Sequence, residues 1–167
     1  MPLQLLSIQS HQQIQQVADL AKPIWQQHFT PIIGEQQVAY MLEKFQSAKA
    51  IQQQIHDGTS YFAAQMNQNL VGYMALVPDP QQAKVMLSKL YVSKDYRTKG
   101  IGKSLLNQAE CFTQQLGLSG LWLTVNRHNS QTIDWYQRQG FVIVDEQKKA
   151  IGDGFVMDDF IMQKPVG

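Results

Sequence analysis

The stretch from Lys89 to Glu110, KLYVSKDYRTKGIGKSLLNQAE, decides which fold the rest of the chain can form. It begins with strand-forming residues that end at Val92, passes through a basic loop, and then carries apolar residues at spacings of three and four. This spacing is typical of an amphipathic helix, which the sequence predicts from about Gly100 onward. The apolar positions of that helix are Ile101, Leu105, Ala109, Phe112 and Leu116.

The predicted start of this helix has the properties of an anion-binding site. The first backbone N–H groups of a helix have no partner inside the helix, and the helix dipole is positive at that end. Gly100 and Gly102 let a ligand come close to the backbone, and Arg97, Lys99 and Lys103 add positive charge. The segment predicts a phosphate or pyrophosphate site, and a solvated basic loop is the alternative.

The spacing of the glycines disfavours two familiar nucleotide-binding loops. The chain has no GxxxxGK[ST] sequence, and the GxGxxG pattern fails because Leu105 stands at the position of the third glycine. The sequence therefore argues against a nucleoside triphosphatase and against a conventional dinucleotide-binding enzyme.

Length and composition indicate one domain over residues 1–167. Of the 167 residues, 44% are hydrophobic and 16% are charged, and the net charge of +1 gives no support for nucleic-acid binding. The sequence contains no apolar stretch of membrane-spanning length and no secretory signal pattern. The single cysteine, Cys111, fits a reducing compartment and is interpreted as a small structural residue. We expect a cytoplasmic protein without membrane association.

The rest of the chain predicts an α/β (α+β) layer arrangement with a mixed sheet. A strand at 3–8 precedes a helix that is capped by Ser10 and kinked or divided by Pro23. Asn129 or Ser130 caps a later short helix, and Pro78 forces a loop. The other expected helices lie at 34–45 and 48–56, and the other strands at 61–66, 70–77, 84–92, 121–125, 141–144 and 155–162.

A second motif downstream joins the basic loop. Arg97-Thr98-Lys99-Gly100-Ile101-Gly102 is followed by Val125-x-x-x-Asn129-x-x-Thr132-x-x-x-Tyr136-x-x-x-Gly140-Phe141. Together with the order of the elements, these motifs resemble those of the GCN5-related N-acetyltransferase (GNAT) superfamily, over roughly residues 61–162. The resemblance implies a mixed, mostly antiparallel central sheet of about seven strands flanked by helices.

The resemblance also implies acetyl-CoA as a cosubstrate. The backbone of Leu90, Tyr91 and Val92 would bond the pantetheine arm, which lies like an added strand. Asn129 would contact the pantetheine or thioester end, and Tyr136 would be the general acid that protonates the departing thiolate. The residues implied for the pyrophosphate are Arg97, Lys99, Gly100, Ile101, Gly102, Lys103 and Ser104.

Structural interpretations of the same residues stay open at this point. From its helical spacing alone, Tyr136 is equally well a core aromatic residue, and Asn129 is equally well a helix cap. Trp122, Trp135 and Phe141 are expected in the core.

The chain departs from the family pattern at the general base. Many members carry a glutamate on the strand before the loop, where it takes a proton from the substrate, but Ser88 stands there in this chain. Serine can hold a water molecule and is too weak a base to act alone. The candidate substitutes are His28, Glu35 and a chain of water molecules, with a structural hydrogen-bonded role as the alternative for His28.

The resemblance implies an acceptor site built from the first helices and the last strands. The run from Ile151 to Met162 resembles the bacterial spermidine/spermine N-acetyltransferase branch. Acidic and aromatic groups together suit a cationic amine. A solvated strand edge is the alternative for the acidic residues. The residues expected at this site are Trp25, His28, Phe29, Tyr40, Tyr73, Asp153, Asp158 and Asp159.

We expect an enzyme that transfers acetyl from acetyl-CoA to a primary amine, a polyamine or another small amine, by direct attack in a ternary complex. A backbone amide near Val92 would polarise the thioester carbonyl. One alternative is N-acetylation of a peptide or protein. A peptide acceptor needs an open groove, whereas a polyamine needs a closed acidic pocket. Another is a CoA-binding sensor without catalysis. No ligand spacing suggests a metal, and the family implies a possible homodimer.

Overall fold

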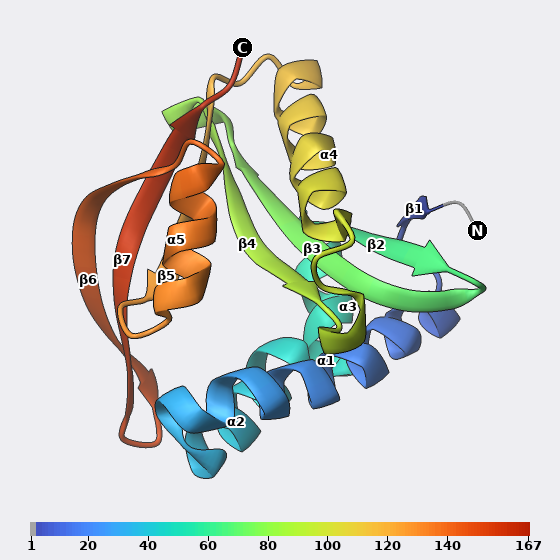
Figure 1. Cartoon of the computed structure of the whole chain (residues 1–167), viewed down its shortest axis with the longest axis vertical. Coiled ribbons are helices and arrows are strands. Elements are labelled where there is room, and N and C mark those ends of the chain that lie inside the picture. The colour runs from blue at the N-terminus through green and yellow to red at the C-terminus, as the bar shows by residue number, and fades with distance from the viewer. Residues whose placement is uncertain (1–2) are drawn as a thin grey trace.

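The computed structural model describes residues 3–167, which form one seven-stranded sheet with helices on both faces (Figure 1). The strands follow the order β1-β2-β3-β4-β5-β7-β6, and every neighbouring pair is antiparallel except β4 and β5. The expected mixed, mostly antiparallel sheet is confirmed. The strands are β1 (Gln4–Ser7), β2 (Ser60–Met66), β3 (Asn69–Asp79), β4 (Lys84–Val92), β5 (Gly120–Asn126), β6 (Val142–Gly152) and β7 (Phe155–Pro165).

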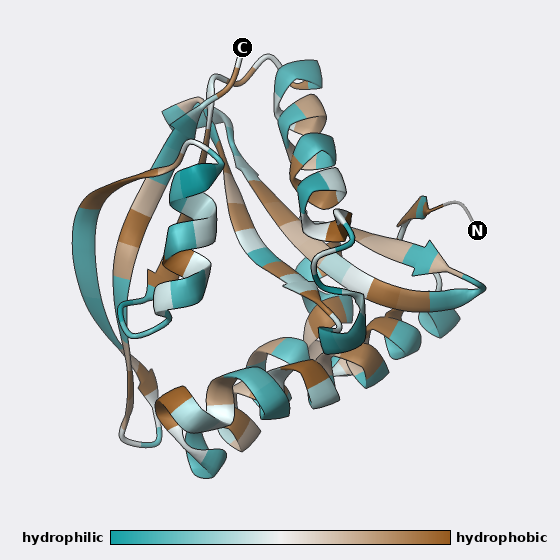
Figure 2. Cartoon of the chain, in the orientation of Figure 1, coloured by the Kyte–Doolittle hydropathy of each residue, from teal (hydrophilic) through white to brown (hydrophobic). Residues whose placement is uncertain are grey.

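The helices turn their apolar sides to the sheet and form a core on each face (Figure 2). One core lies under α4 and α5, and the other lies under α1, α2 and α3. No helix in residues 3–167 has the length and apolar character needed to cross a membrane. The helices are α1 (His11–Ile33), α2 (Glu35–Met41), α3 (Ala48–His56), α4 (Ile101–Gln115) and α5 (Ser130–Arg138).

Helix α1 is longer than the sequence predicts, because neither of its prolines ends it. Ser10 caps the helix, which then continues through Pro23 and Pro31. A proline inside a helix removes one backbone hydrogen bond and normally kinks or ends the helix. Packing in the core offsets this loss here, since the next residues bury large apolar side chains: Ile24, Trp25 and Phe29.

Three other elements differ from their predicted bounds. β3 runs through Pro78, because its pairing with β2 has already ended at Leu76 and the proline has a strand neighbour only on the β4 side. β6 is 11 residues long rather than a short strand, since it pairs with β7 along most of its length. The helix predicted at 34–45 is divided into α2 and a π-helical turn, Leu42–Gln46.

The central strands β4 and β5 lie side by side over only part of their length. They pair only through their first three residues, which end at Met86 and Trp122. Beyond these residues no pairing joins the two strands, and they diverge (Figure 1). β4 also carries a bulge at Ser88, the residue left over between two pairs with β3. The sheet is therefore open in its middle.

The packing of α4 provides a matched test of the core. Leu105 is 0% exposed, whereas Leu116, at the end of the same helix, is 49% exposed. Leu105→Ala is expected to lower the free energy of unfolding by about 2–5 kcal/mol, because it leaves a cavity. Leu116→Ala is expected to change it by less than about 0.5 kcal/mol. Urea unfolding of both variants measures the two values, and equal losses would contradict this packing.

Candidate active site

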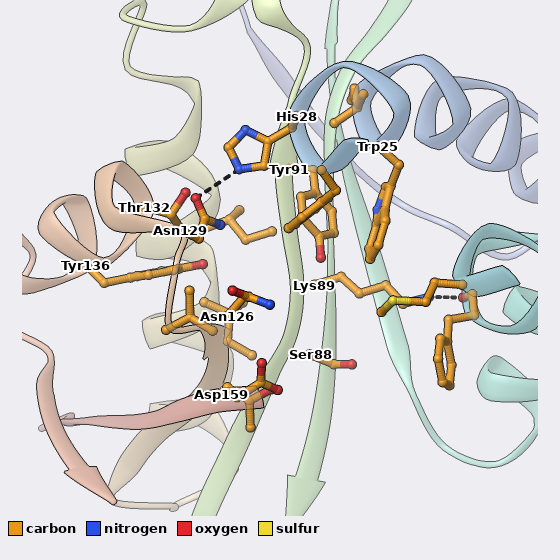
Figure 3. Close-up of a pocket in the computed structure, with 18 of the residues that line it drawn as sticks. Trp25, His28, Ser88, Lys89, Tyr91, Asn126, Asn129, Thr132, Tyr136 and Asp159 are labelled. Carbon is orange, nitrogen blue, oxygen red and sulfur yellow. Dashed lines mark hydrogen bonds between the residues drawn. The ribbon is translucent and has the colours of Figure 1, made fainter. Parts of the chain in front are cut away.

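A large cavity occupies the gap between the diverging strands β4 and β5. Its volume is about 1030 Å³, and its walls come from α1, β4, the start of α4, β5, α5 and the β6–β7 pair. Figure 3 shows side chains from α1, β4, β5, α5 and β7 around it. Cavities of this size hold cofactors and small-molecule ligands. The divergence of the two strands is what creates this space.

The edge of β4 that faces the cavity has backbone groups without a strand partner. The Ser93 N–H donates to the Val71 carbonyl of β3 over 2.8 Å. Alternate residues of an antiparallel strand bond to the same neighbour, so Tyr91 also directs its backbone to β3, whereas Leu90 and Val92 direct theirs to the open edge. All three residues line the cavity. The backbone contact predicted for Tyr91 is therefore corrected: its amide faces β3, and its ring is the part that reaches the cavity.

The start of α4 offers unpaired N–H groups to the same cavity. Gly100 precedes the helix with a φ of 78°, in the left-handed region that favours glycine. The first internal bond runs from the Ser104 N–H to the Gly100 carbonyl, so the N–H groups of Ile101, Gly102 and Lys103 have no partner within the helix. These three residues and Gly100 line the cavity, whereas Ser104 does not.

The basic side chains beside the helix start differ in position. Arg97 and Lys103 line the cavity, whereas Lys99 is exposed and lies outside the lining. Arg97 Nε donates to the Val92 carbonyl over 3.1 Å, and Lys103 Nζ donates to Gln139 Oε1 over 2.8 Å. Two of the three predicted cations therefore flank the free N–H groups of α4.

Asn129 and His28 connect α5 to α1 at the cavity (Figure 3). His28 Nε2 lies 3.0 Å from Asn129 Oδ1, so Nε2 donates its proton to the amide oxygen. Burial lowers the pKa of His28, the bond to Asn129 acts in the opposite direction, and the charge of Arg97 lowers the pKa further. His28 is therefore neutral at pH 7, and it holds the Asn129 side chain in place.

Tyr136 reaches the cavity from α5 (Figure 3). Its ring contacts Trp135 and Phe141, with ring centroids 5.2 and 5.3 Å away. Burial raises the pKa of the phenol, so the group is protonated at neutral pH and can donate a proton. Phe141 is a core residue, as expected, but Trp122 and Trp135 line the cavity.

Asp159 on β7 is the one carboxylate among the described residues that line the cavity. Its side chain is 2% exposed, and Oδ2 has no hydrogen-bond partner within residues 3–167. Burial raises the pKa of Asp159 most, and the charge of Asp158 raises it further. The charge of Arg127 lowers it, and the pKa of Asp159 is about 6. The sequence indicated Asp159 only as one of several acidic residues. Strand alternation could have singled it out, because Asp158 and Asp159 face opposite sides of the sheet.

Lys89 is a second buried ionisable group on the cavity wall. The bulge at Ser88 turns it toward the face covered by α1, α2 and α3, where Nζ donates to the Phe45 carbonyl, to Gln54 Oε1 at 3.1 Å and to Tyr61 OH at 2.6 Å. An ammonium group has three N–H donors, so these acceptors use all of them. Burial lowers the pKa of Lys89 to about 7. Lys89 therefore ties β4 to the segments that follow α2.

Three aromatic side chains, Trp25, Phe29 and Tyr91, form an aromatic wall of the cavity. The Trp25 ring lies 4.3 Å from that of Phe29 and 5.5 Å from that of Tyr91, measured between centroids. Trp25 and Phe29 were expected at the acceptor site, whereas Tyr91 was expected only as a backbone contact. Trp25 and Phe29 are four residues apart in helix α1, a spacing that places them on one face of the helix.

Two tyrosines that were expected at the acceptor site do not line the cavity. Tyr73 is 0% exposed in the core and donates to Gln46 Oε1 over 2.8 Å. Tyr40 donates to the Ile151 carbonyl over 2.7 Å and packs on Phe155. Both are therefore corrected to structural residues of the core and of the packing between α2 and the β6–β7 pair.

The acidic residues other than Asp159 also lie outside the lining. Asp153 is exposed in the turn between β6 and β7, Glu35 is exposed at the start of α2, and Asp158 pairs with Arg127. Within residues 3–167, no group of three or more His, Cys, Asp or Glu side chains is arranged to hold a metal ion. The expected acidic pocket is thus reduced to a single carboxylate among the described lining residues.

The cavity meets the requirements of a ligand built on coenzyme A. That ligand combines an extended pantetheine arm with a pyrophosphate, and the open edge of β4 and the first turn of α4 suit these two parts. Leu90 and Val92 would receive the arm, and the free N–H groups of α4 with Arg97 would receive the pyrophosphate. The fold and the site therefore define a CoA-dependent acyltransferase.

Comparison with known families reaches the same class. The model of the acetyltransferase (GNAT) family matches residues 15–141. The chain belongs to this family, and it is an N-acetyltransferase that uses acetyl-CoA.

Two known proteins and one solved structure illustrate the similarity. The chain is 26% identical over 160 residues to the spermidine N(1)-acetyltransferase of Thermoplasma acidophilum, covering 93% of this chain and 92% of that one. It is 29% identical over 85 residues to the streptothricin acetyltransferase of Streptomyces lavendulae, covering 51% and 45%. The structure of PaiA N-acetyltransferase from Thermoplasma acidophilum in complex with coenzyme A has a TM-score of 0.84 and 25% identity, covering 99% of both chains.

Substitution at the start of α4 tests the donor site. An arginine at Gly102 would obstruct the helix start, where even a Cβ would lie 3.4 Å from the Trp135 ring. Gly102→Arg is expected to weaken acetyl-CoA binding by about 10-fold or more, which is about 1.4 kcal/mol. Asn107→Arg, on an exposed position of the same helix, adds the same charge elsewhere and is the control. Titration calorimetry measures both, and unchanged binding by Gly102→Arg would place the pyrophosphate elsewhere.

Proposed function

We propose that the enzyme transfers acetyl from acetyl-CoA to the primary amine of a small molecule, by direct attack in a ternary complex. The observation that carries this proposal is the continuity of the cavity, which joins the open edge of β4 and the start of α4 to Tyr136 and to further walls from α1, β6 and β7. The donor residues occupy one part of the lining. The rest, including the aromatic wall, is left for an acceptor.

The residues of the chain supply positioning and proton transfer for this reaction. Bound acetyl-CoA supplies the activated acetyl group. The free N–H groups of Leu90 and Val92 orient the donor, and one of them polarises the thioester carbonyl. Tyr136 donates a proton to the departing thiolate, which its raised pKa permits at neutral pH. The single cysteine, Cys111, is exposed on α4 outside the lining, which favours direct attack over an acyl-enzyme.

His28 and Ser88 both line the cavity and have supporting roles in the proposal. His28 uses Nε2 to hold Asn129, which in turn lies where the thioester end of the donor is expected. Ser88 stands at the bulge of β4 and can hold a water molecule, but a hydroxyl is too weakly basic to take a proton from an amine alone. Neither residue therefore supplies a strong base.

The charges of the lining bear on the choice of amine. The aromatic wall suits a cation, and the similarity to a spermidine N(1)-acetyltransferase supports a polyamine. Among the described lining residues, however, Asp159 is the one carboxylate, and Lys44, Lys89 and Lys149 are on the same lining. We therefore propose that the acceptor presents one ammonium to the cavity. A polyamine would keep its other ammonium groups outside.

Removal of the Tyr136 hydroxyl tests the proposed general acid. Tyr136→Phe keeps the ring contacts with Trp135 and Phe141 but cannot donate a proton. We expect kcat to fall by about 10²–10⁴-fold, with little change in acetyl-CoA binding. Steady-state kinetics and titration calorimetry give the two values, and Tyr40→Phe, outside the cavity lining, is the matched control. An unchanged kcat would remove Tyr136 from this role.

A panel of acceptors tests the proposed substrate class. Purified enzyme is supplied with acetyl-CoA and with simple primary monoamines, spermidine, amino acids or short peptides, and free CoA release is measured. We expect turnover with small primary amines, including amines that carry one positive charge. Turnover restricted to peptides would favour peptide N-acetylation, and CoA binding without any turnover would favour a sensor. Either of these results would contradict the proposal.

A further inference from the structure

Asp159 carries a buried carboxylate that is left without a hydrogen-bond partner at one oxygen. Its side chain is 2% exposed, and Oδ2 has no hydrogen-bond partner within residues 3–167. Arg127, the cation that acts on it, is bound to Asp158 over 2.7 Å and to Glu146 over 3.0 Å. A buried carboxylate without a partner costs stability, so such a group calls for a ligand that completes it.

The position of Asp159 directs this carboxylate into the cavity. On β7, Asp158 and Phe160 face the side occupied by Arg127, whose guanidinium lies 4.9 Å from the Phe160 ring centroid. Asp159 faces the other way and lies opposite Asn126 of β5. Figure 3 shows its carboxylate beside Asn126, with the phenol of Tyr136 reaching toward the same space from α5. A carboxylate and a phenol thus face one cavity from neighbouring elements.

We propose that Asp159 binds the ammonium group of the acceptor and accepts its proton during acetyl transfer. This inference rests on the proposed amine acetylation. Asp159 supplies, from β7, the carboxylate that β4 lacks at Ser88. Asp159 is the one carboxylate among the described lining residues, so it is the side chain there that can form an ion pair with an ammonium group.

The proposed step conserves protons and electron pairs. The ammonium nitrogen passes one proton to Asp159, and its lone pair forms the N–C bond to the thioester carbonyl carbon as the C–S bond breaks. The electron pair of that bond leaves on sulfur, which takes a proton from Tyr136. The nitrogen gives up its second proton and restores the Tyr136 phenol, while Asp159 releases its proton to solvent. The amide product is uncharged, so its attraction to Asp159 is lost.

The charged and titratable groups around Asp159 set the pH dependence of this step. Burial and the charge of Asp158 raise the pKa of Asp159, and Arg127 lowers it, to give about 6. Asp159 accepts a proton only when it is ionised, so kcat/KM should rise with pH through this value. The groups on the elements packed around it are Arg127 after β5, Glu146, Lys148 and Lys149 on β6, Asp158 on β7, Lys89 and Tyr91 on β4, and Tyr136 on α5.

The first experiment removes the charge of Asp159 with little change in shape. Asp159→Asn is expected to lower kcat/KM for the best amine of the acceptor panel by about 100-fold or more, with the Kd of acetyl-CoA unchanged. Asp134→Asn removes an exposed carboxylate from α5, outside the cavity lining, and should leave both values unchanged. Equal activity of Asp159→Asn and the wild type would overturn the proposal.

A second experiment shifts the pKa of Asp159 without touching the cavity lining. Asp158→Asn removes the charge that raises this pKa, so the acidic limb of the kcat/KM profile should move to lower pH. Arg127→Met removes the charge that lowers it, so the same limb should move to higher pH. Neither residue lines the cavity. A limb that stays in place in both variants would exclude Asp159 as the group that titrates.

Thermal stability separates a functional carboxylate from a structural one. The folded protein raises the pKa of Asp159 from 3.8 to about 6. The protonated carboxyl therefore stabilises the fold below about pH 3.8, and this contribution is lost as pH rises through about 6. Asp159→Asn should therefore raise Tm at pH 7.5 while it lowers activity. A structural aspartate would lower Tm when replaced, and that result would contradict the proposal.

The failures of the two proposals have different signatures. Turnover of amines by the wild type together with full activity of Asp159→Asn would overturn the role of Asp159 and leave amine acetylation standing. Acetyl-CoA binding without turnover on any amine by the wild type would overturn amine acetylation itself, and the inference on Asp159 with it.

Discussion

The parting of β4 from β5 is the constraint on which the site depends. A parallel pair that ends after three residues leaves the edge of β4 unpaired and opens a cavity of about 1030 Å³ inside a sheet that is buried on both faces. Backbone N–H groups without partners cost free energy when water is excluded. We therefore propose that an extended ligand completes the open edge at Leu90 and Val92 by taking the place of a strand.

Two ionisable groups with raised pKa values line the cavity that this gap opens. Tyr136 and Asp159 lie on elements beyond the gap, α5 and β7, and burial raises the pKa of both. Tyr136 keeps its proton at neutral pH and the pKa of Asp159 is about 6, which is why we propose that they act as acid and base within one cavity. Lys89, on the β4 side, is occupied by three acceptors and contributes to structure.

Most of the residues predicted between Leu90 and Ser104 line the cavity, whereas only some of those predicted for the acceptor site do. The glycine-containing loop and the helix start are contiguous in the chain, so the pattern around Gly100 and Gly102 contains their geometry. Strand register is not local, which is why Tyr91 was predicted to offer its backbone and Tyr73 was predicted to face a substrate. Strand alternation distinguishes Asp159 from Asp158, but the gap between β4 and β5 and the ion pair that occupies Arg127 are not visible in sequence spacing.

Amide hydrogen exchange, followed by NMR with and without coenzyme A, shows whether the donor binds along the open edge of β4. We expect the amides of Leu90 and Val92 to exchange quickly in the free protein and to become protected when coenzyme A binds. The amide of Tyr91, already bonded to β3, should be protected in both states. Unchanged exchange at Leu90 and Val92 upon saturating coenzyme A would contradict the claim that the open edge of β4 receives the donor.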